Sequence, residues 1–182
     1  LAREILDLRD ANGWTHLDLH CLPAILHNTP ERIPDTVRAA VTDHSELLAE
    51  VKICNTPGSP AYDSQNCQLY RKEVGSGALH FGYQVSANDP QRFPDVCGDD
   101  CREEIAARWR QMIDAAEEAY DKTSDCAFTA FPAYEYTNSR GISNRHRNVV
   151  FAGRTVPEVP VSYYEAPTSY ALWSQLKEQC RE

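Results

Sequence analysis

The chain has 182 residues, with 42% hydrophobic and 25% charged side chains, which is ordinary for one globular domain with a core. Its formal net charge of −9 and its lack of any lysine- and arginine-rich block argue against nucleic acid as a partner. No apolar stretch approaches the roughly 20 residues of a membrane-spanning helix, so we expect no membrane insertion.

The first part of the chain combines a helical pattern with a short alternating segment. Leu1–Leu8 has the spacing of a helix, whereas residues 16–20 alternate polar side chains and leucine with the period of a strand. Alternation places His16, Asp18 and His20 on one side of that strand, where they could bind a divalent ion. A surface strand whose wet face carries these residues explains the pattern equally well.

A short apolar run, Val37–Val41, predicts a buried strand that ends at Thr42-Asp43-His44. In α/β folds, ligands and metals collect at the carboxyl ends of strands. His44 is therefore a candidate metal ligand, and Asp43 is a candidate to orient a neighbouring ligand or a water. Alternatively, Asp43 or Ser45 caps the one or two helical turns that we expect over residues 45–51.

The cysteines suggest an oxidising environment. Seven are many for a cytosolic protein of this size, and no Cys-x-x-Cys pair points to a zinc site. Cys54 and Cys67 bracket a loop rich in proline, glycine, serine and asparagine, and Cys97 and Cys101 bracket a turn at the start of a helix. Loops closed in this way indicate disulfides and an exported protein, periplasmic or extracellular. Seven reduced cysteines in a cytosolic protein are the alternative.

The second half of the chain alternates helix and strand patterns, which favours an α/β fold with parallel pairing. We predict a packing helix over Arg102–Tyr120, with Trp109 in the core. Two strands are predicted at Ala127–Phe131 and Asn148–Phe151, and a last helix from about Pro167. We predict irregular chain over two stretches, Asn55–Asn66 and Gly75–Asp95, because glycine, proline and polar residues dominate them.

Two further polar side chains accompany these strands. Glu135 follows the strand pattern of Ala127–Phe131, where a carboxylate could bridge two cations. His146 immediately precedes the strand that we predict from Asn148, and it is another candidate ligand. Three arginines lie around it in sequence, Arg140, Arg145 and Arg147. They suggest an anion-binding edge of the site, or else a solvated surface loop without a role.

These segments resemble the polymerase-and-histidinol-phosphatase (PHP) superfamily. The residues that carry the resemblance are Val41-Thr42-Asp43-His44, Tyr134-Glu135-Tyr136-Thr137 and His146-Arg147-Asn148-Val149-Val150-Phe151. More closely, the chain is similar to an uncharacterised bacterial branch, a domain-of-unknown-function family of often exported proteins, through Asn144–Val149 and Cys54–Ser64. The resemblance covers about Asp18 to the C-terminus.

The resemblance implies an α/β fold, a partial or distorted β/α barrel of the TIM-like, PHP type with long irregular loops. It also implies a cluster of zinc, manganese or iron ions at the carboxyl ends of the strands. The ligands would be His20, His44, Glu135 and His146. Among the candidate catalytic residues, Arg145 or Arg147 would hold a phosphate oxygen, and Asp43 would act beside the metal.

The chain also departs from the superfamily pattern. Leu22 stands where the second histidine of the opening motif would fall, and the later ligands have no counterpart before Glu182. We therefore expect a single PHP-like domain over residues 1–182 that is incomplete at its C-terminus, with Cys180 left unpaired.

The expected function is a metal-dependent hydrolase, a phosphoesterase that uses metal-bound hydroxide on a small-molecule phosphoester or other anionic substrate. The alternative is a non-catalytic, disulfide-stapled binding or envelope-associated module whose metal site has degenerated. A third reading is a disulfide-stapled extracellular domain without any metal.

Overall fold

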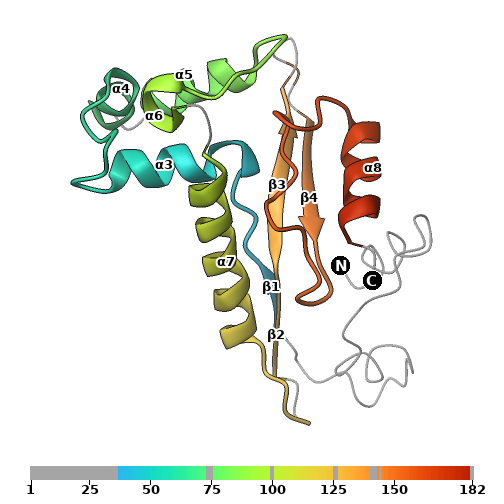
Figure 1. Cartoon of the computed structure of the whole chain (residues 1–182). Coiled ribbons are helices and arrows are strands. Elements are labelled where there is room, and N and C mark those ends of the chain that lie inside the picture. The colour runs from blue at the N-terminus through green and yellow to red at the C-terminus, as the bar shows by residue number, and fades with distance from the viewer. Residues whose placement is uncertain are drawn as a thin grey trace.

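The computed structural model describes residues 37–72, 76–98, 101–124, 127–139, 143 and 145–180. In chain order the elements are β1 (Val37–Ala40), η2 (Ser45–Leu47), α3 (Leu48–Asn55), α4 (Gln65–Lys72), α5 (Ser76–Val85), α6 (Pro94–Cys97), α7 (Arg102–Ala119), β2 (Phe128–Phe131), β3 (Ala133–Asn138), β4 (Arg145–Val150) and α8 (Ser169–Gln179). The strands run side by side between α7 and α8, and α3 to α6 gather at one end (Figure 1). Among the described residues, no helix combines the length and the apolar character that crossing a membrane would require.

The strands form two small sheets, which are joined because β2 of one sheet runs almost directly into β3 of the other. β1 pairs with β2 in parallel, and β3 pairs with β4 in antiparallel fashion. Only Pro132 separates β2 from β3, and its missing N–H interrupts the hydrogen-bond ladder there. The register of the parallel pair nevertheless continues, because Val37 lies opposite Phe128 and His44 lies opposite Glu135, seven residues further along each segment.

The predicted β/α barrel is wrong. The described residues contain two sheets of two strands each, and these strands do not close into a barrel. A barrel of this type needs successive parallel strands, each followed by a helix. Only six residues connect β3 to β4, whereas a parallel crossover needs about a dozen or more. The chain therefore turns back and pairs β4 antiparallel to β3.

Side-chain alternation gives the β3–β4 pair two different faces. Tyr134 lies opposite Val149 in the ladder, and residues directly opposite each other point to the same face. This face packs against α7 and α8 in the main hydrophobic core, whose buried residues include Trp109, Tyr134, Tyr136, Val149, Phe151, Leu172 and Leu176. We call it the apolar face. The prediction that Trp109 is a core residue is confirmed, since its side chain is fully buried.

A second cluster, formed by α3 to α6, is held together by disulfides. Cys54 is bonded to Cys67, and Cys97 is bonded to Cys101, as the loop patterns predicted. Such bonds are typical of proteins that mature in an oxidising compartment. Of the cysteines in the described part of the chain, Cys180 is free.

The prediction of irregular chain over Gly75–Asp95 is wrong, because α5 occupies Ser76–Val85. Glycine disfavours a helix by about 1 kcal/mol relative to alanine, but tertiary packing decides here. Phe81 is buried against the Cys54–Cys67 bond. Gly77 is needed for this packing, since a Cβ atom there would overlap the carbonyl oxygen of Tyr70 in α4.

Candidate metal centre

Three polar side chains from three segments meet on the second face of the strands. His44, after β1, forms a parallel bridge with Glu135 of β3, and His146 of β4 lies opposite Thr137 of β3. Glu135 and Thr137 are two residues apart, so both point to the same side of the strand. Because paired residues share a face, the two histidines, Glu135 and Thr137 lie together. We call this the polar face.

The geometry of the three ionisable residues suits a metal ion. His44, Glu135 and His146 can each offer a ligand atom, and these atoms lie within 4.8 Å of one another. Nδ1 of His146 is 2.5 Å from Oε1 of Glu135, a direct polar contact that an ion would have to replace, and Nε2 of His44 is 3.8 Å from Oε2. Imidazole nitrogens and carboxylate oxygens are ligands that zinc, iron and manganese accept.

The polar face is open to solvent. The side chains of His44 and His146 are each 50% exposed, and that of Glu135 is 19% exposed. The structure thus brings together three of the four predicted metal ligands, and this group could hold an ion. The fourth, His20, lies outside the described residues.

Thr137 contacts both imidazoles. Its hydroxyl oxygen is 2.9 Å from Nδ1 of His44 and 3.0 Å from Nδ1 of His146. A hydroxyl can donate one hydrogen bond and accept others, so it can serve two rings at once. Thr137 was not among the predicted site residues, although its spacing of two from Glu135 is a usable signal for a shared face.

Glu46 supports this group from inside the molecule. Its side chain is 1% exposed, and Oε1 accepts hydrogen bonds from the backbone N–H groups of Thr137 (3.0 Å) and Tyr163 (3.1 Å). Oε2 has no hydrogen-bond partner among the described residues and lies 3.9 Å from Nδ1 of His44. Burial raises the pKa of Glu46 from its ordinary 4.5 to about 7, against the opposing effect of these hydrogen bonds.

Glu50, one helical turn further on, is also buried but belongs to a different network. Its Oε1 is 3.0 Å from the guanidinium of Arg92, which also contacts Glu165 at 3.2 Å. Burial raises the pKa of Glu50, and the charge of Arg92 opposes that rise. Arg92 also donates to the backbone carbonyl of Glu46 at 3.0 Å.

The three predicted catalytic residues lie differently. The backbone carbonyl of Asp43 accepts from the N–H of Glu135 at 2.9 Å, which holds the neighbouring His44 in register. The side chain of Asp43 is exposed and is not part of the three-residue group. Its catalytic role stays a prediction.

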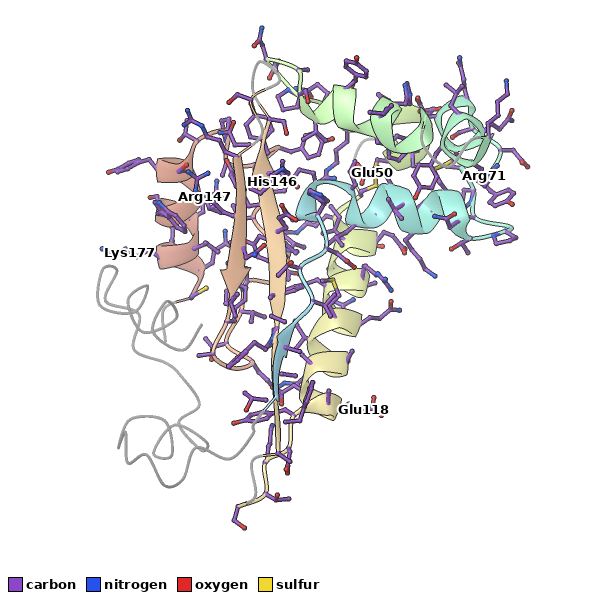
Figure 2. All side chains as sticks on the ribbon, turned by 180° about the vertical axis from the view of Figure 1, so that it is seen from behind. Glu50, Arg71, Glu118, His146, Arg147 and Lys177 are labelled. Carbon is purple, nitrogen blue, oxygen red and sulfur yellow. A yellow bond between two sulfur atoms is a disulfide. The ribbon has the colours of Figure 1, made fainter. Side chains whose placement is uncertain are left out.

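The arginines occupy the other side of β4. Arg147 pairs with Tyr136 and Arg145 with Asn138, so alternation turns both away from the side of His146. In Figure 2, Arg147 lies on the α8 side of the strand and His146 on the side of η2. The prediction that His146 precedes the strand is wrong, because β4 begins at Arg145. The phosphate clamp by Arg145 or Arg147 stays a prediction that this placement does not favour.

Comparison with known proteins gives one family. The model described as "Protein of unknown function (DUF3604)" matches residues 38–182, which include all three residues of the metal-ligand group. No curated protein and no solved structure matches the chain.

The resemblance to the PHP superfamily is therefore corrected, because the match is to DUF3604 and nothing found links the chain to PHP proteins. The motifs that carried the resemblance are only a few residues long, and short motifs recur without common descent. The chain belongs to the DUF3604 family, whose members are described as proteins of unknown function.

Proposed function

We propose that His44, Glu135 and His146 bind a catalytic divalent metal ion, and that the protein is a metal-dependent hydrolase. The proposal is carried by one observation, the convergence of two imidazoles and a carboxylate on the solvent-open polar face. The metals that this set of ligands suits are zinc, manganese and iron.

The exposure of the group favours a catalytic rather than a structural ion. Structural zinc sites are closed by four protein ligands, whereas catalytic sites use three and keep a position open for water or substrate. The described residues offer three ligands, and both imidazoles are half exposed. A bound ion of this kind lowers the pKa of water and polarises a phosphoryl or carbonyl oxygen.

Charge favours an anionic substrate only in the presence of the ion. The chain has a formal net charge of −9, and the carboxylates of Glu135 and Glu46 lie at or behind the polar face. Without a cation, these charges would repel a phosphate or carboxylate. A divalent ion would neutralise these two carboxylates and present a positive centre at the open position, so we propose a small phosphoester or related anionic ester as the substrate class.

The two disulfides support an extracytoplasmic location for this activity. Bonds such as Cys54–Cys67 and Cys97–Cys101 persist where the cytosolic thiol systems do not act. We therefore propose that the hydrolase works in the periplasm or outside the cell. This location can be tested by alkylating free thiols during cell lysis and counting them in the protein. We expect the cysteines of both disulfides to resist alkylation, because both bonds should already be formed in the cell.

Metal content and hydrolysis test the proposal together. The chain is purified without chelators, its metals are measured by plasma mass spectrometry, and phosphomonoesters and phosphodiesters are assayed with added zinc, manganese or iron. We expect about one ion per chain, and loss of ion and hydrolysis in His146→Ala. His80→Ala is the control, because His80 contacts Asn66 in the α3–α6 cluster.

Two other outcomes are informative. Bound metal without any hydrolysis would reject the enzyme and favour a non-catalytic binding or envelope-associated module. A wild-type chain that binds no metal at millimolar concentration would reject the centre itself.

A further inference from the structure

The free oxygen of Glu46 is an unusual feature of the polar face. The carboxyl is buried, and Oε2 has no hydrogen-bond partner among the described residues. Buried polar atoms almost always have a hydrogen-bond partner, so a buried oxygen without one needs a physical explanation. A nitrogen lies near this oxygen, Nδ1 of His44 at 3.9 Å.

Glu46 cannot easily turn this oxygen elsewhere. Oε1 accepts from the N–H groups of Thr137 and Tyr163, whereas the Ser45 hydroxyl, 3.3 Å from Oε1, is closer to the backbone carbonyl of Glu135 at 2.9 Å. The two N–H donors come from separate segments and hold Oε1 in place. Nδ1 of His44 lies 2.9 Å from the hydroxyl oxygen of Thr137, and its 3.9 Å distance to Oε2 of Glu46 is longer than a hydrogen bond. The contact therefore requires the half-exposed ring to rotate toward Glu46.

Such a contact decides which nitrogen of His44 binds metal. In its ionised form the carboxylate of Glu46 can only accept, so a nitrogen that turns toward it must carry the proton. Nε2 then keeps its lone pair for an ion placed between it and Oε2 of Glu135, which lies 3.8 Å away. Histidine ligands commonly donate their other N–H to a carboxylate, which fixes the tautomer and the direction of the ring.

We propose that Glu46 is a positioning residue of the metal centre: it holds the proton of His44 on Nδ1 and leaves Nε2 free to bind the ion. Glu46 also holds the amide of Thr137, whose hydroxyl contacts both imidazoles. One buried carboxyl therefore sets the tautomer of one ligand and the place of the hydroxyl between the two. This inference rests on the metal centre proposed above.

Glu46→Gln tests the inference sharply. The amide oxygen of glutamine must face the N–H donors of Thr137 and Tyr163, because the reverse orientation would set donors against donors. The NH₂ group then points at Nδ1 of His44, which becomes an acceptor, and the proton moves to Nε2. We expect zinc or cobalt to bind about 10- to 100-fold more weakly, as for other losses of a ligand's carboxylate partner.

Glu50→Gln is the matched control. Glu50 is as deeply buried as Glu46 and its Oε2 also lacks a partner among the described residues, but it contacts Arg92 instead of a metal-ligand residue. We expect this variant to lose stability and to keep the metal affinity of the wild type. A fall of equal size in both variants would overturn the inference, because the loss would then come from general damage to the fold.

The tautomer of His44 is read directly from long-range proton–nitrogen NMR spectra of the metal-free full chain at pH 8. We expect a proton on Nδ1 in the wild type and in Glu50→Gln, and on Nε2 in Glu46→Gln. The same tautomer in the wild type and Glu46→Gln would overturn the inference even if metal binds. Failure of the wild type to bind zinc or cobalt would instead overturn the proposed function, and the positioning role with it.

Discussion

The two faces of the β3–β4 pair are built from alternate residues of the same strands, and they differ in almost every physical property. Tyr134, Tyr136 and Val149 of the apolar face are buried among side chains of α7 and α8. Glu135, which lies between the two tyrosines in sequence, and His146, three residues before Val149, face solvent together with His44. The apolar face stabilises the fold, and the polar face carries the proposed metal ligands. The rigid packing of the first therefore holds the ligands of the second at fixed spacing.

The largest expected effect comes from breaking the apolar face at Trp109. Its ring packs edge-on against Tyr134 with centroids 5.7 Å apart, and its Nε1 donates to the carbonyl of Pro157 at 2.9 Å. Trp109→Ala should lower the free energy of unfolding by about 3–5 kcal/mol. Denaturant titration measures this loss. Native stability in the variant would mean that this face is not the core.

The second effect concerns Glu46, which joins the two faces through Thr137 and Tyr163. Its pKa is raised from 4.5 to about 7 in the folded chain, so the unfolded chain loses the proton first as pH rises. Its contribution is thus complete below pH 4.5 and lost by about pH 7, a fall of up to about 3 kcal/mol in the free energy of unfolding.

Denaturant titrations of the metal-free chain from pH 4 to pH 8 test this dependence. Glu46→Gln has no proton to lose at this position, so its unfolding free energy should fall less steeply over the same range. Glu50 has a raised pKa of the same origin and contributes with the same sign in both proteins. Equal pH dependence in wild type and variant would contradict the assignment to Glu46.

The third effect is the stabilisation of the fold by a metal ion, which should depend on the polar face alone. An ion that binds only the folded chain should raise its stability by about 2.7 kcal/mol at a concentration 100 times Kd. Thermal unfolding with and without zinc should show this gain in the wild type and not in His44→Ala. Without metal, His44→Ala should stay within about 0.5 kcal/mol of the wild type, since the side chain is half exposed. A metal-induced gain that survives the substitution would place the ion elsewhere.

The smallest effect is expected at Thr137, whose hydroxyl lies between the imidazoles. Thr137→Val keeps the shape and removes the hydroxyl. We expect a loss of about 1 kcal/mol in stability and a fall of about tenfold in metal affinity, measured by calorimetric titration. Thr129→Val is the control, because Thr129 is equally buried on β2 and is not part of the metal-ligand group.

Local sequence patterns predicted the elements that depend on neighbours along the chain. The helix around Trp109 and the strands at Val37 and Ala127 were found close to their predicted positions. The two predicted disulfides are also present, and each closes a short loop: the paired cysteines are 13 positions apart for Cys54–Cys67 and 4 for Cys97–Cys101. His44, Glu135 and His146 were proposed as ligands from their chemistry and their closeness to predicted strands, and the structure brings them together.

The features that were missed depend on contacts across long stretches of sequence. Glu46 and Thr137 are 91 residues apart, and only the folded chain shows that the carboxyl of one holds the amide of the other. The barrel, which the PHP resemblance implied, was wrong because only β1 and β2 pair in parallel, whereas β3 and β4 form an antiparallel pair. Arg145 and Arg147 were assigned to the site because they flank His146, yet neighbours on a strand point to opposite faces.

Anomalous X-ray diffraction from crystals of the chain grown with zinc or manganese tests the central claim most directly. We predict an anomalous peak on the polar face, about 2.0–2.3 Å from a nitrogen of His44, a nitrogen of His146 and an oxygen of Glu135. Crystals that hold the metal at other residues, or that show no peak between these three at a saturating metal concentration, would contradict the account.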